Sequence, residues 1–194
     1  DCTGHGVPGA MLSFIGYFLL NNIVDNDKAL NAGSICDMLH EGVRTTLKQD
    51  REDASGRDGM DIAICKINVK KKELHFAGAH RPLYLVRKGE LIEYKGDRKA
   101  IGGIPLGNKA EQPFTNYVIN ILNGDRVFFF SDGLPDQLGG PEHKKYSPGR
   151  IRNLICENNS FSMSQYYELF VQDFEEWKGE SKQIDDVLLI GIEF

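Results

Sequence analysis

The hydrophobic spacing of this 194-residue chain changes near residue 60, and that change constrains its fold more than any other feature. Before it, apolar residues recur at the spacing of a helix that buries one face. After it come short runs rich in Val, Ile, Tyr and Phe, which are typical of strands bounded by turns. Helical spacing returns near residue 148, and a last apolar run follows. Helices and strands in separate blocks predict an α+β fold, with helices layered against antiparallel sheet.

Four helices are expected, and several of their ends carry recognisable signals. Ser34 with Asp37 has the form of a capping box, as does Ser162 with Gln165. Pro8 suits a first helical turn. The first helix is expected to be buried, because its apolar residues recur along it at helical spacing. The predicted helices cover residues 10–24, 34–47, 148–157 and 162–178.

Seven strands are expected, and two long segments between them are rich in Gly and Pro. A tight turn at residues 123–125, with the sequence Asn-Gly-Asp, is expected to join the fifth strand to the sixth. The last strand is wholly apolar along most of its length, so we expect it to be buried on both faces. Residues 96–113 and 135–149 are expected to be loops. The predicted strands cover residues 60–69, 72–78, 82–88, 90–95, 114–122, 126–130 and 185–194.

Composition excludes several classes of function. A formal net charge of −5 argues against a general nucleic-acid binder, which carries a basic face. Cys2, Cys36, Cys65 and Cys156 are widely spaced and form no CxxC pair, so they give no zinc pattern. Cys36 and Cys65 lie in apolar stretches and predict buried, reduced thiols and a cytoplasmic location. The sequence has no signal-peptide pattern, and the apolar stretch at residues 10–24 is too short and interrupted to span a bilayer.

Acidic residues lie at the ends of two apolar strands. Asp132 directly follows one strand, and the pair Asp185-Asp186 begins another. If these strands are antiparallel neighbours, their carboxylates crowd at one edge of the sheet, and Asp1 would be a fourth. Like charges at such range need a compensating cation, and carboxylates suit magnesium or manganese. The alternative is structural, because Asp-Gly is a common turn and an Asp before a strand often caps one.

Six segments in order carry a resemblance to a known family. They are DCTGHGVPGAM, DGMDIAIC, FAGAHRPLYLV, DRKAIGGIPLG, FFFSDGLPDQLGGPEHKK and QIDDVLLIGI. Together they closely resemble the bacterial serine phosphatases of the metal-dependent (type 2C, PPM) protein phosphatase family, in the branch of the sporulation stage II phosphatase and the stress-response sigma-factor regulators. The resemblance covers nearly the whole chain. It implies a layered α/β/β/α sandwich of antiparallel sheets flanked by helices.

The resemblance also implies roles for particular residues. Asp1 would bridge two divalent metal ions, manganese or magnesium, and the backbone carbonyl of Cys2 would meet one of them. Asp132 would bind a metal ion. In the QIDDV segment Asp185 is preferred to Asp186 as the remaining ligand, because the family's last motif uses its first acidic position. Asp1, Asp132 and Asp185 are thus the expected catalytic residues.

Two departures from the family pattern limit what is carried over. The family has a further Asp upstream, in a Gly-Gly-Asp stretch, together with the first strands of its central sandwich. We therefore expect residues 1–194 to be a C-terminal phosphatase domain that lacks its N-terminal strands, holds metal poorly or pairs with another copy at the exposed sheet edge. Thr3 stands where the eukaryotic branch has a His assigned as general acid, so that role does not transfer. Gly4, His5 and Gly6 are expected to form a structural turn.

Several other polar residues have either a functional or a purely structural interpretation. Asp61 lies inside a predicted strand and faces either solvent or the site. His80 and Arg81 either approach an anionic substrate or stabilise a turn by hydrogen bonding. Lys144 and Lys145 could attract a phosphoprotein, the alternative being a solvated loop.

Together these expectations describe a metal-dependent protein-serine phosphatase. It would act by direct attack of metal-activated water on phosphoserine. By the same resemblance, the substrate is a small phosphorylated regulator of the anti-sigma-factor-antagonist type, and the domain is the output of a longer sensor protein, with the first two helices as the switch. The alternative is a partner-binding module that keeps the phosphatase fold without catalysis.

Overall fold

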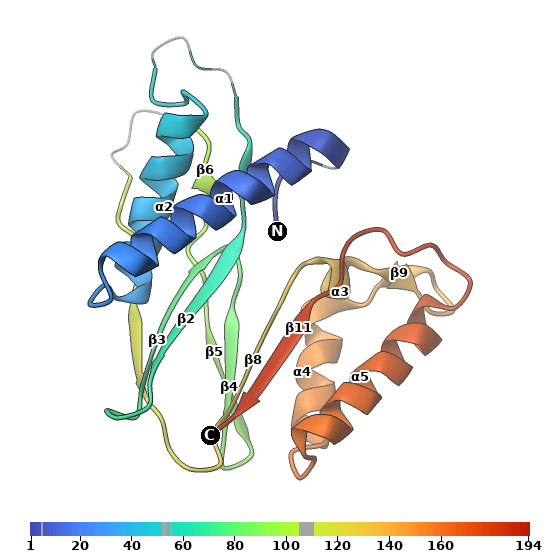
Figure 1. Cartoon of the computed structure of the whole chain (residues 1–194). Coiled ribbons are helices and arrows are strands. Elements are labelled where there is room, and N and C mark those ends of the chain that lie inside the picture. The colour runs from blue at the N-terminus through green and yellow to red at the C-terminus, as the bar shows by residue number, and fades with distance from the viewer. Residues whose placement is uncertain (5, 52–53, 55, 105–110) are drawn as a thin grey trace. The chain divides into compact units, whose positions relative to one another are not determined.

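The computed structural model describes residues 1–4, 6–51, 54, 56–104 and 111–194 (Figure 1). The described chain divides into two compact units, and each unit is made of two separate stretches of the sequence. Unit 1 contains residues 1–82 and 95–121, and unit 2 contains residues 83–94 and 122–194. Helices and several antiparallel sheets are present, so the predicted α+β class is confirmed.

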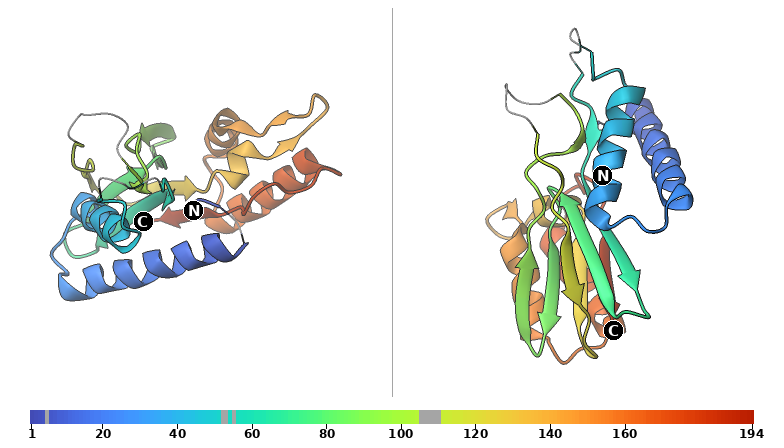
Figure 2. Two further views of the ribbon diagram at one scale, coloured as in Figure 1. Left: turned by 90° about the horizontal axis from the view of Figure 1, so that it is seen from above. Right: turned by 90° about the vertical axis from the view of Figure 1, so that its left-hand side faces the viewer.

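Unit 1 is built from two helices, a three-stranded sheet and a small strand pair. The sheet is antiparallel in the order β2-β3-β7, and β1 pairs with β6. The elements are α1 (Gly6–Asn26), α2 (Ala32–Thr46), β1 (Gly59–Met60), β2 (Ile62–Asn68), β3 (Glu73–Ala79), β6 (Ile101–Gly102) and β7 (Tyr117–Asn120). The right-hand view of Figure 2 shows α1 and α2 lying beside each other.

The core of unit 1 lies under α2. Cys36, Leu39 and Val43 on this helix are completely buried, together with Ile101 of β6. Burial raises the pKa of the Cys36 and Cys65 thiols to about 12, so both stay protonated at neutral pH. Cys36 is therefore the buried thiol that its apolar neighbours predicted, whereas Cys65 is half-buried.

Helix α1 is longer and more exposed than the sequence pattern predicted. It has 21 residues, and Met11, Phe14, Tyr17 and Phe18 are each more than 60% exposed. The prediction of a buried helix is therefore wrong for this face. By length and composition alone, α1 is the one described helix that could cross a membrane, a test that core helices and signal sequences also pass. The length limit expected for residues 10–24 does not apply to the helix as it forms, because α1 also includes residues 6–9 and 25–26.

Unit 2 is a four-stranded antiparallel sheet with helices packed on it. The sheet order is β11-β8-β4-β5, and a short hairpin pairs β9 with β10. Tyr84, Phe128, Ile151, Ile155 and Tyr166 are buried between sheet and helices. The elements are β4 (Leu83–Arg87), β5 (Glu90–Tyr94), β8 (Arg126–Phe130), α3 (Gly133–Asp136), β9 (Leu138–Gly139), β10 (Lys144–Lys145), α4 (Ser147–Glu157), α5 (Met163–Lys178) and β11 (Leu189–Glu193).

Three details of the prediction are corrected. The turn at residues 123–125 forms, but it joins β7 to β8, which belong to different sheets rather than to one hairpin. Strand β11 is half-exposed instead of buried on both faces, because it is the edge strand of the described sheet. The cap of α2 is Asn31, whose side chain accepts a hydrogen bond from the backbone N–H of Ser34.

A partly buried ion pair joins α4 to α5 and gives unit 2 a dependence on pH. Arg150 Nε donates to Asp173 Oδ2 at 2.7 Å, and the Tyr146 hydroxyl donates to the same carboxylate. Burial alone would raise the pKa of Asp173, but the hydrogen bonds from Arg150 and Tyr146 lower it below its ordinary value. The pair therefore stabilises the fold fully above the unfolded pKa of about 4 and less as the pH falls through the folded pKa.

Asp173→Asn is expected to lower the free energy of unfolding at pH 7 by about 1 kcal/mol, because charged hydrogen bonds become neutral ones. Chemical denaturation at pH 7 and near pH 3 measures the free energy of unfolding and how much of it is lost on acidification. The variant should lose less stability than the natural protein on acidification. Glu193→Gln is the control, since it removes an exposed pair with Arg126 that contributes little. Equal acid sensitivity of the natural protein and Asp173→Asn would contradict this assignment.

Candidate functional site

The predicted carboxylates of unit 2 are brought together by the pairing of β8 with β11. The strands are antiparallel, with Leu189 opposite Phe130, so the end of β8 meets the start of β11. Ser131 fastens this junction. Its backbone N–H donates to the Leu188 carbonyl at 3.0 Å, and its hydroxyl donates to the Asp186 carbonyl at 2.8 Å. The strand ends on which the acidic residues lie are thus neighbours, as the sequence predicted.

Gly133 lets the turn after β8 touch the acidic segment before β11. A Cβ atom at Gly133 would lie 2.3 Å from the Asp186 carbonyl oxygen and 3.2 Å from the carbonyl carbon of Asp185. Only a residue without a side chain fits at this separation. The glycine of the SDG segment is therefore required by a close approach of two backbones and not by an unusual φ angle.

The two acidic positions of unit 2 differ in what their side chains do. Asp132 precedes the short helix α3 but makes no side-chain capping bond to it, and its carbonyl accepts from the Asp136 N–H. The Asp132 carboxylate is therefore not a helix cap, while the backbone at Asp132 does turn, as the structural alternative for Asp-Gly expected. Asp185 Oδ1 accepts a hydrogen bond from the N–H of Asp186 at 2.8 Å, as in a local turn. Both Asp185 and Asp186 are exposed.

In unit 1 the first residues are paired with the segment around β1. The Thr3 N–H donates to the Gly59 carbonyl and the Asp61 N–H donates to the Asp1 carbonyl, both at 2.8 Å, and Cys2 forms a bridge with Met60. This pairing fixes Asp1 beside Asp61. Gly4 and Gly6 follow with φ angles of +87° and +65°, the left-handed conformation that glycine adopts freely in a turn. His5 lies outside the described residues.

Asp1 also belongs to a charged network that the sequence did not specify. Arg81 Nη2 lies 2.6 Å from Asp1 Oδ2 and 3.0 Å from Asp61 Oδ2. His80 Nδ1 lies 2.9 Å from Asp61 Oδ1. Asp61 therefore faces these polar groups rather than open solvent. Its position inside a strand-like run, followed at a distance by a His-Arg turn, was the available sequence signal.

Lys144 and Lys145 lie on β10 and are largely exposed. Lys144 pairs with Glu142, and Lys145 Nζ lies 3.0 Å from Asp136 Oδ2. Exposed lysines with carboxylate neighbours match the solvated alternative and leave the ammonium groups accessible to an anionic partner.

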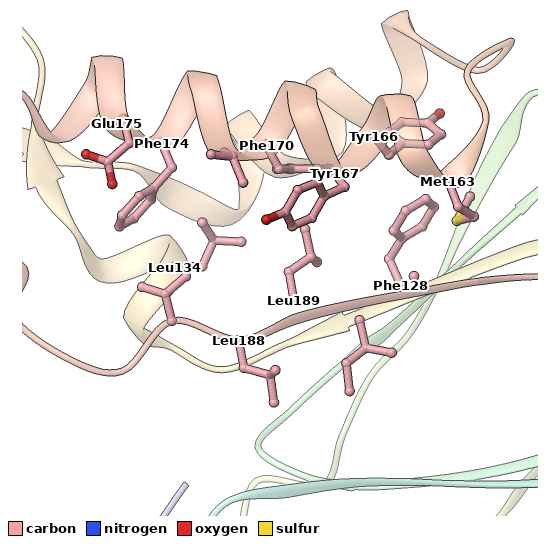
Figure 3. Close-up of a pocket in the computed structure, with 14 residues that line it drawn as sticks. Phe128, Leu134, Met163, Tyr166, Tyr167, Phe170, Phe174, Glu175, Leu188 and Leu189 are labelled. Carbon is pink, nitrogen blue, oxygen red and sulfur yellow. The ribbon is translucent and has the colours of Figure 1, made fainter.

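Unit 2 also contains an apolar cavity of about 560 Å³ between α5 and the start of β11 (Figure 3). Phe128, Phe170 and Leu189 face one another across it, with Glu175 at its margin (Figure 3). Neither Asp132 nor Asp185 lines this cavity. Its lining has no convergent set of carboxylates, so it is separate from the candidate catalytic residues.

The chemistry of the donors fits a hard divalent cation. Carboxylate and backbone carbonyl oxygens are the ligands that magnesium and manganese take, and no thiol or imidazole is needed from the predicted set. Within the part of the chain that the structure describes, no three His, Cys, Asp or Glu side chains form a group that could hold a metal ion. Asp1 belongs to unit 1, whereas Asp132 and Asp185 belong to unit 2.

Three solved structures share the fold over the whole of this chain. The SiaA-PP2C domain of Pseudomonas aeruginosa is 25% identical, with a TM-score of 0.85 and 73% of that chain covered. The PP2C phosphatase domain and regulatory fragment of SpoIIE from Bacillus subtilis is 13% identical, with a TM-score of 0.72 and 52% covered. The RsbU and RsbW domains of Rv1364c from Mycobacterium tuberculosis are 17% identical, with a TM-score of 0.68 and 51% covered.

The chain thus spans about half the length of the second and third of these structures. A further relative in fold is the catalytic domain of the serine/threonine phosphatase PstP, solved in complex with two manganese ions. It is 16% identical, with a TM-score of 0.62, and the match covers 98% of this chain and 83% of that one.

No curated protein sequence matches. The sequence model of the family described as stage II sporulation protein E (SpoIIE) matches residues 1–194 in full. The chain therefore belongs to the SpoIIE family of PP2C-type phosphatase domains.

Proposed function

We propose that the chain is the metal-dependent protein-serine phosphatase domain of a longer protein. In this proposal residues 1–194 belong to an α/β/β/α sandwich. The observation that carries the proposal is the junction of β8 with β11, because it gathers Asp132 and the Asp185-Asp186 pair at one edge of the sheet. Membership of the SpoIIE family supports the same activity.

The proposed site assigns a task to each predicted residue. The carboxylates of Asp1, Asp132 and Asp185 and the carbonyl of Cys2 would hold two divalent ions, manganese or magnesium. When bound, such ions supply the activation of a water molecule that attacks the phosphoserine phosphorus directly. Lys144 and Lys145 would attract the anionic phosphoprotein, which their exposure on β10 supports.

The proposed substrate is a phosphorylated regulatory protein of the anti-sigma-factor-antagonist type, acted on in the cytoplasm. The solved structure that joins RsbU and RsbW domains in one chain supports a partner from such a regulatory system. An upstream sensor domain would control the activity, and a second copy could cover an exposed sheet edge.

Release of phosphate from a phosphoserine protein tests the proposal. We expect turnover in the intact protein that requires manganese or magnesium and stops when a chelator removes the metal. The rival function is a docking module that keeps the fold. Stable binding of the phosphoprotein without any metal-dependent turnover would establish that rival and overturn the phosphatase.

A further inference from the structure

Arg81 lies between two carboxylates that reach it from different segments. One guanidinium nitrogen, Nη2, is 2.6 Å from Asp1 Oδ2 and 3.0 Å from Asp61 Oδ2. The Arg81 side chain is only 13% exposed, and the two carboxylate side chains are 25% and 23% exposed. A guanidinium presents several donors in a rigid plane, so this arrangement fixes direction as well as charge.

Asp61 holds Arg81 in this position and also contacts His80. Its two oxygens are divided between partners, Oδ1 with His80 Nδ1 at 2.9 Å and Oδ2 with Arg81. Asp61 is itself fixed by the hydrogen bond from its backbone N–H to the Asp1 carbonyl. Asp1 and Asp61 are therefore joined twice, through the backbone and through the guanidinium of Arg81.

The turn that carries Arg81 has a strained and closely packed backbone. His80 has a φ of +58°, a conformation that costs a residue other than glycine about 1–3 kcal/mol. Its N–H donates to the Asp97 carbonyl at 2.8 Å. A Cβ atom at Gly78 would lie 2.1 Å from the Arg81 carbonyl oxygen, and one at Gly96 would lie 2.6 Å from it. Two glycines and a strained histidine thus set the direction of one arginine, and such strain marks a residue whose position matters.

We propose that Arg81, held by Asp61, is a positioning residue that orients the Asp1 carboxylate for a divalent metal ion. This inference rests on the proposed function, in which Asp1 is a metal ligand. Partners of this kind, which bond a ligand without touching the metal, fix the ligand's orientation, and their loss typically weakens metal affinity about 10–100-fold.

The positive charge of Arg81 does not argue against this role. A lone cation beside a metal ligand would repel the metal, but Asp61 balances the guanidinium at 3.0 Å, so the Arg81–Asp61 pair is formally neutral. Asp1 keeps its own negative charge for the metal. The remaining effect of Arg81 is to orient the Asp1 carboxylate. Without Arg81, the Asp1 and Asp61 carboxylates would repel each other.

Titration of manganese into the intact, metal-free protein by calorimetry tests the proposal without any measurement of activity. Arg81→Met is expected to weaken manganese binding about tenfold while circular dichroism stays unchanged. Arg81→Lys keeps the charge and loses the planar geometry, so it is expected to weaken binding as well. If Arg81→Met does not fold, Arg81→Lys decides the question alone.

Arg87→Met is the matched control. Arg87 makes a two-bond pair with Asp125, with Nε to Oδ1 at 2.9 Å and Nη2 to Oδ2 at 2.6 Å, at the end of β8 away from Asp132. Its loss should lower the melting temperature and leave manganese affinity unchanged. Unchanged or tighter manganese binding by Arg81→Met and Arg81→Lys would overturn the inference.

Asp1→Asn separates this inference from the function on which it rests. If Asp1→Asn weakens manganese binding and the Arg81 variants do not, Asp1 is a ligand and only the positioning role fails. If Asp1→Asn itself leaves manganese affinity unchanged, Asp1 is not a metal ligand and the proposed metal site is wrong.

Discussion

Asp132→Asn is expected to lower metal-dependent phosphate release more than about 100-fold, because loss of a direct ligand costs more than loss of a partner that only orients one. Asparagine has the same shape and lacks the negative charge that binds a divalent ion. The fold should survive the change, since Asp132 makes no side-chain cap on α3 and the junction of β8 with β11 is fastened by Ser131. Phosphate release and circular dichroism together measure the two expectations.

Asp136→Asn is the control for this prediction, because it places the same chemical change at the end of the short helix α3, which directly follows Asp132. Asp136 pairs with Lys145 at the surface, where ion pairs contribute about 0–1 kcal/mol. The control should therefore keep activity within about twofold, because Lys145 keeps its own charge and its exposure when Asp136 becomes neutral. Full activity in Asp132→Asn would remove Asp132 from the site, and an equal loss in both variants would point to α3 rather than to a ligand.

The features that the sequence predicted well are those decided by neighbouring residues. The capping box of α5 forms as expected, with Ser162 and Gln165 bonded in both directions, and Gly179 ends the helix with a φ of +53°. Such signals depend on hydrogen bonds within one turn. The convergence of Asp132 with the Asp185-Asp186 pair was also predictable, because it needs only two strands to be antiparallel neighbours.

Features decided by distant pairing were missed. The turn between Leu122 and Asp125 forms, yet β7 pairs with β3 and β8 pairs with β4 and β11, since a turn does not determine which strand each arm joins. The apolar sequence of β11 indicated burial on both faces, but sheet order makes it an edge strand among those described. Composition reports what a strand could bury and not where it lies in the sheet.

The network around Asp1 was predictable only in part. Asp61, His80 and Arg81 each stood out in the sequence, but their meeting depends on the left-handed backbone of His80 and on the close approach of Gly78 to the Arg81 carbonyl. Neither is visible in a residue pattern, because a positive φ is uncommon at any residue other than glycine. The same limit applies to α2, where Asn31 and not Ser34 supplies the cap.

Gly133→Ala is expected to lower the free energy of unfolding by about 2–3 kcal/mol and to reduce phosphate release sharply. The added methyl group would lie 2.3 Å from the Asp186 carbonyl oxygen, so one of the two backbones must retreat. That retreat would separate Asp132 from the Asp185-Asp186 segment, which the proposed site requires to be close. Chemical denaturation and phosphate release measure the two effects on one sample.

Gly149→Ala distinguishes this steric effect from the general consequence of replacing glycine. Gly149 lies in the first turn of α4, where an added Cβ would meet Ser147 Oγ at an ordinary 3.5 Å. Alanine should stabilise that helix by up to about 1 kcal/mol, because glycine loses more backbone freedom on folding. If Gly133→Ala lowers the free energy of unfolding and Gly149→Ala raises it, the loss of stability in Gly133→Ala comes from the contact between Gly133 and Asp186. A Gly133→Ala protein with natural stability and full turnover would mean that this approach is not needed to hold the carboxylates together.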